Sequence, residues 1–297
     1  MDGKLQTFLV LCETMNYRET AERMHLTQPA VTRQIQALEE EYGVRLFSYN
    51  RHVLRKTEGC RILEQYAHTM QYNEQKLLDA LGQKRRKTLR VGATKTIGEY
   101  LLYDRLCRVL EQTEDDLRLT IDNTEQLLYL LERNELDFAL VEGIFQKEKY
   151  DWRLIRMEAF WGICPPRHPL CGRRVSLEEL LGETVIVREP GSGTRNIFER
   201  EMAAAGYGFS AFARCITVSS FSLICRLVAE GYGISFVYEA VAEQEKGVGR
   251  FLVEGWAGRH ALHAVWLRGT DAGETAEQFL EESLEKPESR RFKHTGK

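Results

Sequence analysis

The stretch from Tyr17 to Gln36 constrains the fold of this chain most, because it reads as two short helices joined by a tight turn. In the second helix, Thr27 suits the N-cap, and Pro29 falls in the first turn, where a missing N–H costs nothing. An apolar stripe faces inward (Val31, Ile35, Leu38) and a second stripe faces outward (Pro29, Thr32, Arg33, Gln36). This arrangement predicts a helix-turn-helix unit.

The outward stripe, with Gln28 at its N-terminal end, carries side chains that can recognise base pairs in the major groove. Gln can bridge N6 and N7 of adenine, Arg can bridge O6 and N7 of guanine, and Thr or Pro can contact the thymine methyl. The expected base-contacting residues are Gln28, Pro29, Thr32, Arg33 and Gln36. The solvated face of an ordinary helix would show the same spacing, so the flanking segments decide between the two interpretations.

The flanking segments complete a winged helix. Ahead of the motif, an apolar helical stripe predicts a first core helix (Leu5, Phe8, Leu9, Cys12). Behind it, Gly43 suits a helix C-terminus, and residues 49–56 form a basic, hairpin-like segment. We expect Arg51, Arg55 and Lys56 of this wing to meet DNA phosphates.

Residues 1 to about 90 resemble the N-terminal region of the LysR-type transcriptional regulators. The resemblance rests on the long and specific block TAERMHLTQPAVTRQIQALEEEYGVRLF. It implies that the groove is contacted by Gln28, Pro29, Thr32 and Arg33, and the DNA backbone by Arg51. The chain departs from the family pattern at Thr20, where alanine is usual, and at residues 57–60, where Thr-Glu-Gly-Cys replaces Thr-Glu-Ala-Gly.

Charge limits how this chain can bind DNA. The 297 residues carry a formal net charge of −3, so affinity cannot come from global charge. Within residues 1–58, eight Lys and Arg balance eight Asp and Glu. The cations must therefore act locally, in the wing and the second helix of the motif, with the acidic residues turned away. The length leaves room for two domains or more.

Several classes of protein are not expected. No apolar run marks export or a membrane span, so we expect a cytoplasmic protein without a membrane partner. Seven scattered cysteines without a C-x-x-C pair argue against disulfides and a zinc site. Peroxide sensing, which in one branch of the family uses two cysteines in the segment corresponding to about 189–212, is not expected, because none lies there. No catalytic motif is present, so neither an enzyme nor a cofactor is expected.

Residues 58 to about 87 predict one long helix with a heptad seam. The seam residues expected to mediate dimerisation are Leu63, Tyr66, Met70, Asn73 and Leu77. The stripe could instead pack on the chain's own second domain, but a long helix leaving a small module has little else to bury against. A polar residue at one seam position, here Asn73, can fix the register between two chains. The helix is expected to end in the basic run at 84–87.

Beyond the linker, alternating strands and helices predict an α/β domain with mainly parallel strands. The expected strands are 89–93, 117–122, 138–141, 184–187, 215–218, 234–237 and 261–267. Helices are expected to begin near 98, 124, 176, 194 and 219, with a last one over about 271–285. The length suits two α/β subdomains, with the chain crossing between them near 160–164 and 264–268.

This part of the chain resembles the effector domain of the LysR-type regulators, which has the bilobed fold of periplasmic solute-binding proteins. The resemblance rests on LRVGATKTIGEYLL, LDFALVEG, RHPL, VREPGSGTR and LVAEGYGISFV. The expected fold class is therefore α+β overall. The domains expected are a winged helix-turn-helix domain at 1–58, a linker helix at 59–87 and a bilobed effector domain at 88–297. Lobe I is expected at about 88–162 and 268–290, and lobe II at about 163–267.

Three predicted helix N-termini follow strands, which is where a bilobed fold binds ligands between its lobes. Each offers hydroxyls and backbone N–H groups beside a helix dipole worth about half a positive charge. The expected effector-binding residues are Thr94, Lys95, Thr96, Ser192, Thr194, Ser219 and Ser220. We expect a small anion there, with Lys95 supplying the full positive charge. Ordinary N-cap turns would look alike in sequence, and Asn123, Thr124 and Glu142 are lesser candidates.

Together these features predict a transcriptional regulator with double-stranded DNA and a small-molecule effector as partners. A dimeric winged helix would read a promoter, and closure of the effector domain on an anion would change the assembly on DNA. The resemblance adds that two dimers join into a tetramer. The alternative is a cytosolic solute-binding protein with a vestigial DNA module, and an enzyme acting between the lobes ranks third.

Overall fold

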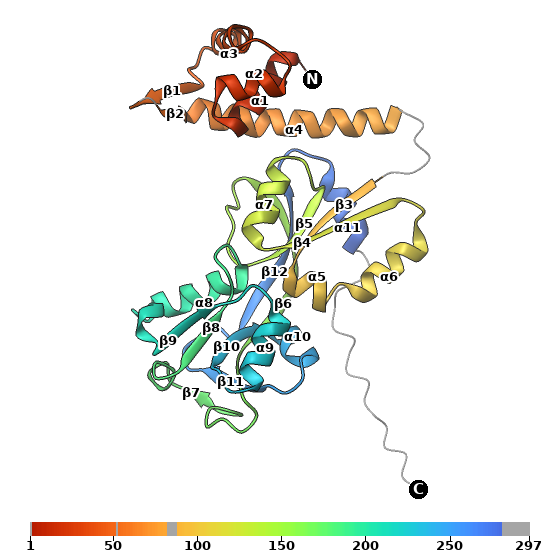
Figure 1. Cartoon of the computed structure of the whole chain (residues 1–297). Coiled ribbons are helices and arrows are strands. Elements are labelled where there is room, and N and C mark those ends of the chain that lie inside the picture. The colour runs from red at the N-terminus through yellow and green to blue at the C-terminus, as the bar shows by residue number, and fades with distance from the viewer. Residues whose placement is uncertain (1, 52, 82–87, 281–297) are drawn as a thin grey trace. The chain divides into compact units, whose positions relative to one another are not determined.

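The computed structural model describes residues 2–51, 53–81 and 88–280, so the basic run at 84–87 lies outside the described residues (Figure 1). The chain divides into two compact units. The first holds the winged helix, the linker helix and two short segments, Glu132–Glu135 and Arg268–Asp271, and the second holds the rest of the effector domain.

The winged helix forms as the sequence predicts. Its elements are α1 (Gly3–Thr14), α2 (Tyr17–Arg23), α3 (Gln28–Tyr42), β1 (Phe47–Asn50) and β2 (Val53–Lys56). The Thr27 hydroxyl caps α3 by accepting from the Ala30 N–H, and Gly43 ends the helix in the left-handed conformation at φ 66°. The inward stripe of α3 is confirmed, because Val31, Ile35 and Leu38 are buried in one core with α1.

The departure at Thr20 leaves no buried polar group unpaired. Thr20 is fully buried in α2, and its hydroxyl donates to the Asn16 carbonyl at 2.8 Å and pairs with the Thr14 hydroxyl at 2.7 Å. An alanine at this position would avoid the need for these bonds. The threonine is therefore compatible with the helix-turn-helix core.

The linker helix α4 (Glu58–Leu81) is one long ribbon in Figure 1. Cys60 and Ala67 on one face are buried in the winged-helix core, and Leu63 packs against the same core. The assignment of Leu63 to a free dimerisation seam is therefore wrong. The buried Cys60 and Ala67, about one turn before and one turn after Leu63, fix the orientation of the helix on its own domain.

The effector domain is built on strands in the order β4-β3-β5-β12-β6-β10-β8-β9, with β11 paired to β6 and β7 paired to β11. The strands anticipated from the sequence are β3 (Thr88–Thr94), β4 (Asp116–Asp122), β5 (Phe138–Glu142), β8 (Thr184–Val187), β9 (Arg214–Thr217), β10 (Ile234–Tyr238) and β12 (Arg259–Leu267). The strands not anticipated are β6 (Tyr150–Cys164), β7 (Arg174–Val175) and β11 (Gly249–Val253). Parallel strands β4-β3-β5 and β10-β8-β9 flank the antiparallel pair β12 and β6.

Helices cover both faces of each half of this sheet. They are α5 (Lys95–Tyr100), α6 (Tyr103–Gln112), α7 (Thr124–Glu132), α8 (Gly193–Ala204), α9 (Phe221–Ala229), α10 (Glu239–Gln244) and α11 (Ala272–Leu280). In the first half, α7 packs on the face that carries Val141 and Val265, whereas Phe279 of α11 lies 5.2 Å from the Phe138 ring. In the second half, α9 packs with Val237, and α8 places Phe198 4.6 Å from Phe236.

The chain passes between the two halves within β6 and again ahead of β12. β6 pairs with β12 as far as Ala159 and with β10 from Phe160, so the first crossing lies where it was expected. The second does not, because Leu262–Val265 of β12 already pair with β5. The return crossing therefore precedes Leu262, and the expected placement of the crossing near 264–268 and of β12 in lobe II is wrong. No helix among the described residues combines the length and apolarity needed to cross a membrane.

Candidate DNA-binding surface and effector site

The outward stripe of α3 forms one surface depression. Gln28, Pro29, Arg33 and Gln36 are exposed, Thr32 is half-buried, and these five residues line the depression. The Thr32 hydroxyl donates to the Gln28 carbonyl at 3.1 Å, so its hydrogen is used within the helix. The amide and guanidinium donors beside it are open to solvent. All five sequence-predicted residues are thus brought together.

The positive charges of the winged helix fall into two groups. Five of the eight Lys and Arg in residues 1–58 form ion pairs: Lys4 with Glu41, Arg18 with Glu22, Arg23 with Glu19, Arg45 with Glu39, and Lys56 with Glu64. Within the described part of the chain, Arg33, Arg51 and Arg55 have no carboxylate partner. The uncompensated charge therefore lies on α3 and the wing, although the domain as a whole is balanced.

Lys56 does not face DNA as expected. Its Nζ donates to both carboxylate oxygens of Glu64 on α4, at 2.7 and 2.9 Å. Burial, the largest single influence, acts to lower the pKa of Lys56, but the hydrogen bond to Glu64 and the charge of Glu64, with smaller contributions from Cys12 and Cys60, together raise it. Lys56 therefore ties the wing to the linker helix, whereas its neighbour Arg55 is exposed.

Arg51 lies in the turn of the wing, between β1 and β2. Its backbone has φ 48°, a left-handed conformation that is uncommon for residues other than glycine. The side chain is exposed. A guanidinium at the tip of a hairpin, without an ion-pair partner in the described residues, is suited to contact a phosphate.

A stripe of apolar side chains on α4 is exposed. The exposed fractions are 53% for Ile62, 63% for Tyr66, 50% for Met70, 56% for Leu77 and 71% for Leu81. These residues recur at helical spacing, with the exposed Asn73 in the gap between Met70 and Leu77. Ile62 takes the place expected for Leu63. We call these six residues the α4 stripe.

In the effector domain, the buried carboxylate of Glu142 at the end of β5 collects three threonine hydroxyls. Thr94 donates to Oε2 at 3.1 Å, and Thr96 and Thr194 donate to Oε1 at 3.1 and 2.9 Å. Thr94 and Thr96 come from the first lobe, and Thr194 comes from α8 of the second. The expectation that these three hydroxyls point at a ligand is therefore not met, because an internal carboxylate takes them.

Burial shifts the pKa of the Glu142 carboxyl more than its hydrogen-bond donors do. The side chain is 1% exposed, and burial raises its pKa. The Thr194 hydroxyl, Arg188, and the hydroxyls of Thr96 and Thr94 oppose the rise without cancelling it. Glu142 therefore joins the two lobes through donors that favour its ionised form.

The backbones of the two lobes are in close contact beside this carboxylate. A side-chain carbon at Gly193 would lie 2.3 Å from the Glu142 carbonyl oxygen, and one at Gly143, whose φ is 87°, would lie 2.8 Å from the Gly193 Cα. Both positions therefore require glycine. Gly193, the residue after Ser192, therefore brings the start of α8 close to the backbone at the end of β5.

The remaining predicted effector residues differ in what they contact. Ser192, at the N-cap of α8, is 1% exposed, and its Oγ has no hydrogen-bond partner in the described part of the chain. Lys95 on α5 donates from Nζ to the Ser219 carbonyl at 2.6 Å, and Ser220 caps α9 by accepting from the Leu223 N–H. Ser192, Lys95 and Ser219 are thus the three predicted residues whose side-chain polar groups are not committed to Glu142 or to a helix cap in the described residues.

An Arg–Glu pair that sequence reasoning missed lies next to this site. Arg188 is 3% exposed, and its guanidinium donates twice to the Glu189 carboxylate, both at 2.8 Å, while lying 4.3 Å from the Phe221 ring. Lys95 Nζ is 3.9 Å from Glu189. The pKa of Glu189 is lowered by Arg188 against the opposing effect of burial, which is the largest single influence. The strand-end position of Arg188 was the only available signal.

Comparison with known proteins accounts for both units. The family described as "Bacterial regulatory helix-turn-helix protein, lysR family" matches residues 3–61, and the LysR substrate binding domain matches residues 82–287. The chain belongs to the LysR family. It is a DNA-binding transcriptional regulator controlled by an effector.

Individual relatives extend over most of this LysR-family chain. The RuBisCO operon transcriptional regulator of Allochromatium vinosum is 30% identical over 292 residues, covering 94% of this chain and 93% of its own. A full-length OxyR variant from Pseudomonas aeruginosa has a TM-score of 0.61 at 22% identity, covering 94% of this chain and 92% of its own. The Synechocystis CcmR regulatory domain in complex with 2-PG has a TM-score of 0.60 at 19% identity, covering 67% of this chain and 98% of its own. The structural likenesses establish the fold.

Proposed function

We propose that α3 reads the operator directly while the wing holds the DNA backbone. Arg33 and Gln28 would contact base edges, with Pro29, Thr32 and Gln36 completing the contact surface, and Arg51 would contact a phosphate. The observation that carries this proposal is the position of the unpaired guanidiniums, because Arg33, Arg51 and Arg55 all lie on α3 or the wing. An electrostatic contact that is local in this way is compatible with a net charge of −3.

The α4 stripe is proposed to join two copies of the chain. Contiguous exposed apolar side chains on a helix are unfavourable in a monomer and are typical of an interface. Asn73 would set the register of the two helices. A tetramer of two such dimers, spanning two sites on promoter DNA in the cytoplasm, completes the proposed assembly.

The effector is proposed to be a small anion at the N-terminus of α8. Ser192 Oγ supports this, because a buried hydroxyl without a partner costs about 1–3 kcal/mol and a ligand acceptor would satisfy it. Lys95 supports it too, since its ammonium donates to a neutral carbonyl that an anionic ligand can replace. Thr94, Thr96 and Thr194 would act through Glu142 on the closure of the lobes. Ser219 and Ser220 would bound the site on the α9 side.

Two experiments test these assignments. Footprinting with the purified full-length protein on the region upstream of its own gene should protect a specific site. The absence of any specific site would favour a solute-binding protein with a vestigial DNA module. Mass spectrometry of small molecules released from the protein should identify an anion, and calorimetry should then show about 1–3 kcal/mol weaker binding for Ser192→Ala. Ser210→Ala, an exposed serine of the same lobe, is the matched control and should bind as the wild type.

A further inference from the structure

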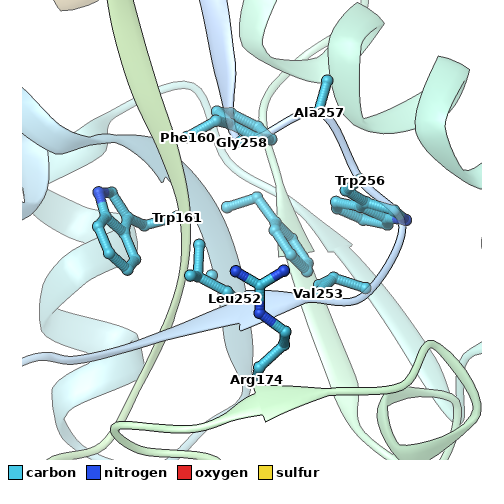
Figure 2. A pocket seen from close by; sticks show the side chains of 10 residues that line it. Phe160, Trp161, Arg174, Leu252, Val253, Trp256, Ala257 and Gly258 are labelled. Atoms are coloured by element: carbon cyan, nitrogen blue, oxygen red, sulfur yellow. The ribbon is translucent and has the colours of Figure 1, made fainter.

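A cavity lies in the second lobe, and neither Ser192 nor Lys95 lines it. It measures about 230 Å³ and is enclosed mainly by residues of β6, β10, β11 and the loop before β12 (Figure 2). Its principal lining residues are Phe160, Trp161, Phe236, Leu252, Trp256 and Arg174. None of these is among the residues of the proposed effector site at α8.

The walls of this cavity are aromatic. Phe236 lies 5.0 Å from Trp256 and 6.3 Å from Phe160, ring centre to ring centre, and both phenylalanines are 5% exposed. Buried rings fixed by neighbouring rings form a rigid apolar surface. Such a surface favours the binding of a flat or hydrocarbon group, because that group is removed from water when it binds.

One cationic side chain complements these walls. Arg174 on β7 stands opposite Leu252 of β11 in the strand register. Its guanidinium points away from its own strand towards the centre of the lining residues, as Figure 2 shows. In the described residues, Arg174 has neither an ion pair nor a side-chain hydrogen bond, whereas its neighbour Arg173 is paired with Glu179 at 2.9 Å. The cavity thus offers one unpaired cation at the edge of an apolar space.

We propose that this cavity binds a small carboxylate with an apolar body. The carboxylate would accept two parallel bonds from the Arg174 guanidinium, and the body would lie against Phe236 and Trp256. A cavity of 230 Å³ holds the liquid volume of roughly eight waters at about 30 Å³ each, which suits a single ring or a short alkyl chain.

The position of the cavity gives this ligand a regulatory function. The Phe160 N–H donates to the Gly258 carbonyl at 3.0 Å, and both residues line the cavity where the chain passes between the lobes. A ligand held here contacts both connections and therefore favours one angle between the lobes. This regulatory effect rests on the proposed control by lobe closure, but binding to the cavity does not.

Titration calorimetry of the full-length protein with sodium phenylacetate tests the proposal, with 2-phenylethanol as the uncharged analogue. Saturable binding of phenylacetate is expected, at least about tenfold tighter than that of the alcohol, because only the acid can pair with Arg174. Arg174→Gln should weaken phenylacetate at least about tenfold, and the matched control Arg173→Gln should not change it. Arg174 is exposed, so the substitution leaves the core intact.

Two further outcomes separate this cavity from the effector site. Ser192→Ala should bind phenylacetate like the wild type; a loss there would place the ligand at α8 and overturn the proposal. Absence of saturable phenylacetate binding to the wild type, or equal binding by Arg174→Gln, would also overturn it. If no anionic effector bound at α8, by contrast, phenylacetate binding and its dependence on Arg174 would be unchanged.

Discussion

Substitution of Leu77 by Asp should dissociate the proposed dimer. Leu77 lies in the α4 stripe and is 56% exposed, so an interface can still bury about half of its side chain, worth ~1–1.5 kcal/mol. A twofold dimer loses this contribution twice, about 2–3 kcal/mol. The two introduced carboxylates would also lose water at an apolar seam, which raises the loss of dimerisation free energy by at least about 1–2 kcal/mol. The total of about 4 kcal/mol corresponds to a roughly thousandfold weaker dimer.

Sedimentation equilibrium over a concentration series measures this change directly. Gln71→Asp is the matched control, because Gln71 is exposed on another face of the same helix and receives the same charge. We expect Gln71→Asp to associate like the wild type and Leu77→Asp to be monomeric, with an unchanged circular dichroism spectrum. Equal association constants for the two variants would refute the assignment of the α4 stripe as an interface.

Three further predictions follow from particular contacts. Thr96→Val removes a donor from the buried Glu142 and should lower the free energy of unfolding by about 1–3 kcal/mol in urea titrations; unchanged stability would show that Thr96 does not support this carboxylate. Burial and then Lys147 lower the pKa of His263 to about 4, so its contribution to stability is present above its ordinary value of 6.5 and is lost as the pH falls towards 4. The free energy of unfolding of the wild type should therefore fall between about pH 7.5 and about pH 5, and that of His263→Gln should fall by about 1–2 kcal/mol less. Parallel profiles of unfolding free energy against pH for the two proteins would contradict this. Arg55→Gln should reduce the slope of log affinity for DNA against log salt by about one. Lys56→Gln should leave that slope unchanged, because the Lys56 ammonium is already paired with Glu64.

The winged helix was predictable because its information is local. The 3.6-residue period of α3 separates Val31, Ile35 and Leu38 from the outward stripe, and Thr27 and Gly43 mark its ends. The position of α4 on this core was not predictable, because the buried set Cys60 and Ala67 depends on contacts with α1. That long-range choice moved Leu63 inward and left Ile62 on the exposed stripe.

The effector site was only partly predictable for the same reason. Strand ends and helix caps correctly located Thr94, Thr96 and Thr194 near one another, but their shared acceptor lies 46 to 52 positions away in sequence. Hydroxyls that cap a helix, bind an anion or donate to an internal carboxylate look alike in sequence. β6 was missed because its exposed half carries charged residues that conceal its alternation, whereas its buried half is a continuous apolar run.

The central claim, that α3 reads sequence and the wing does not, is tested most directly by equilibrium binding of Arg33→Ala and Arg51→Ala to the footprinted operator and to a scrambled duplex. Arg33→Ala should lose about 1–3 kcal/mol on the operator and little on the scrambled duplex, since a bidentate contact to guanine depends on the base. Arg51→Ala should weaken both duplexes equally. A parallel loss on both duplexes for Arg33→Ala would contradict direct readout by α3.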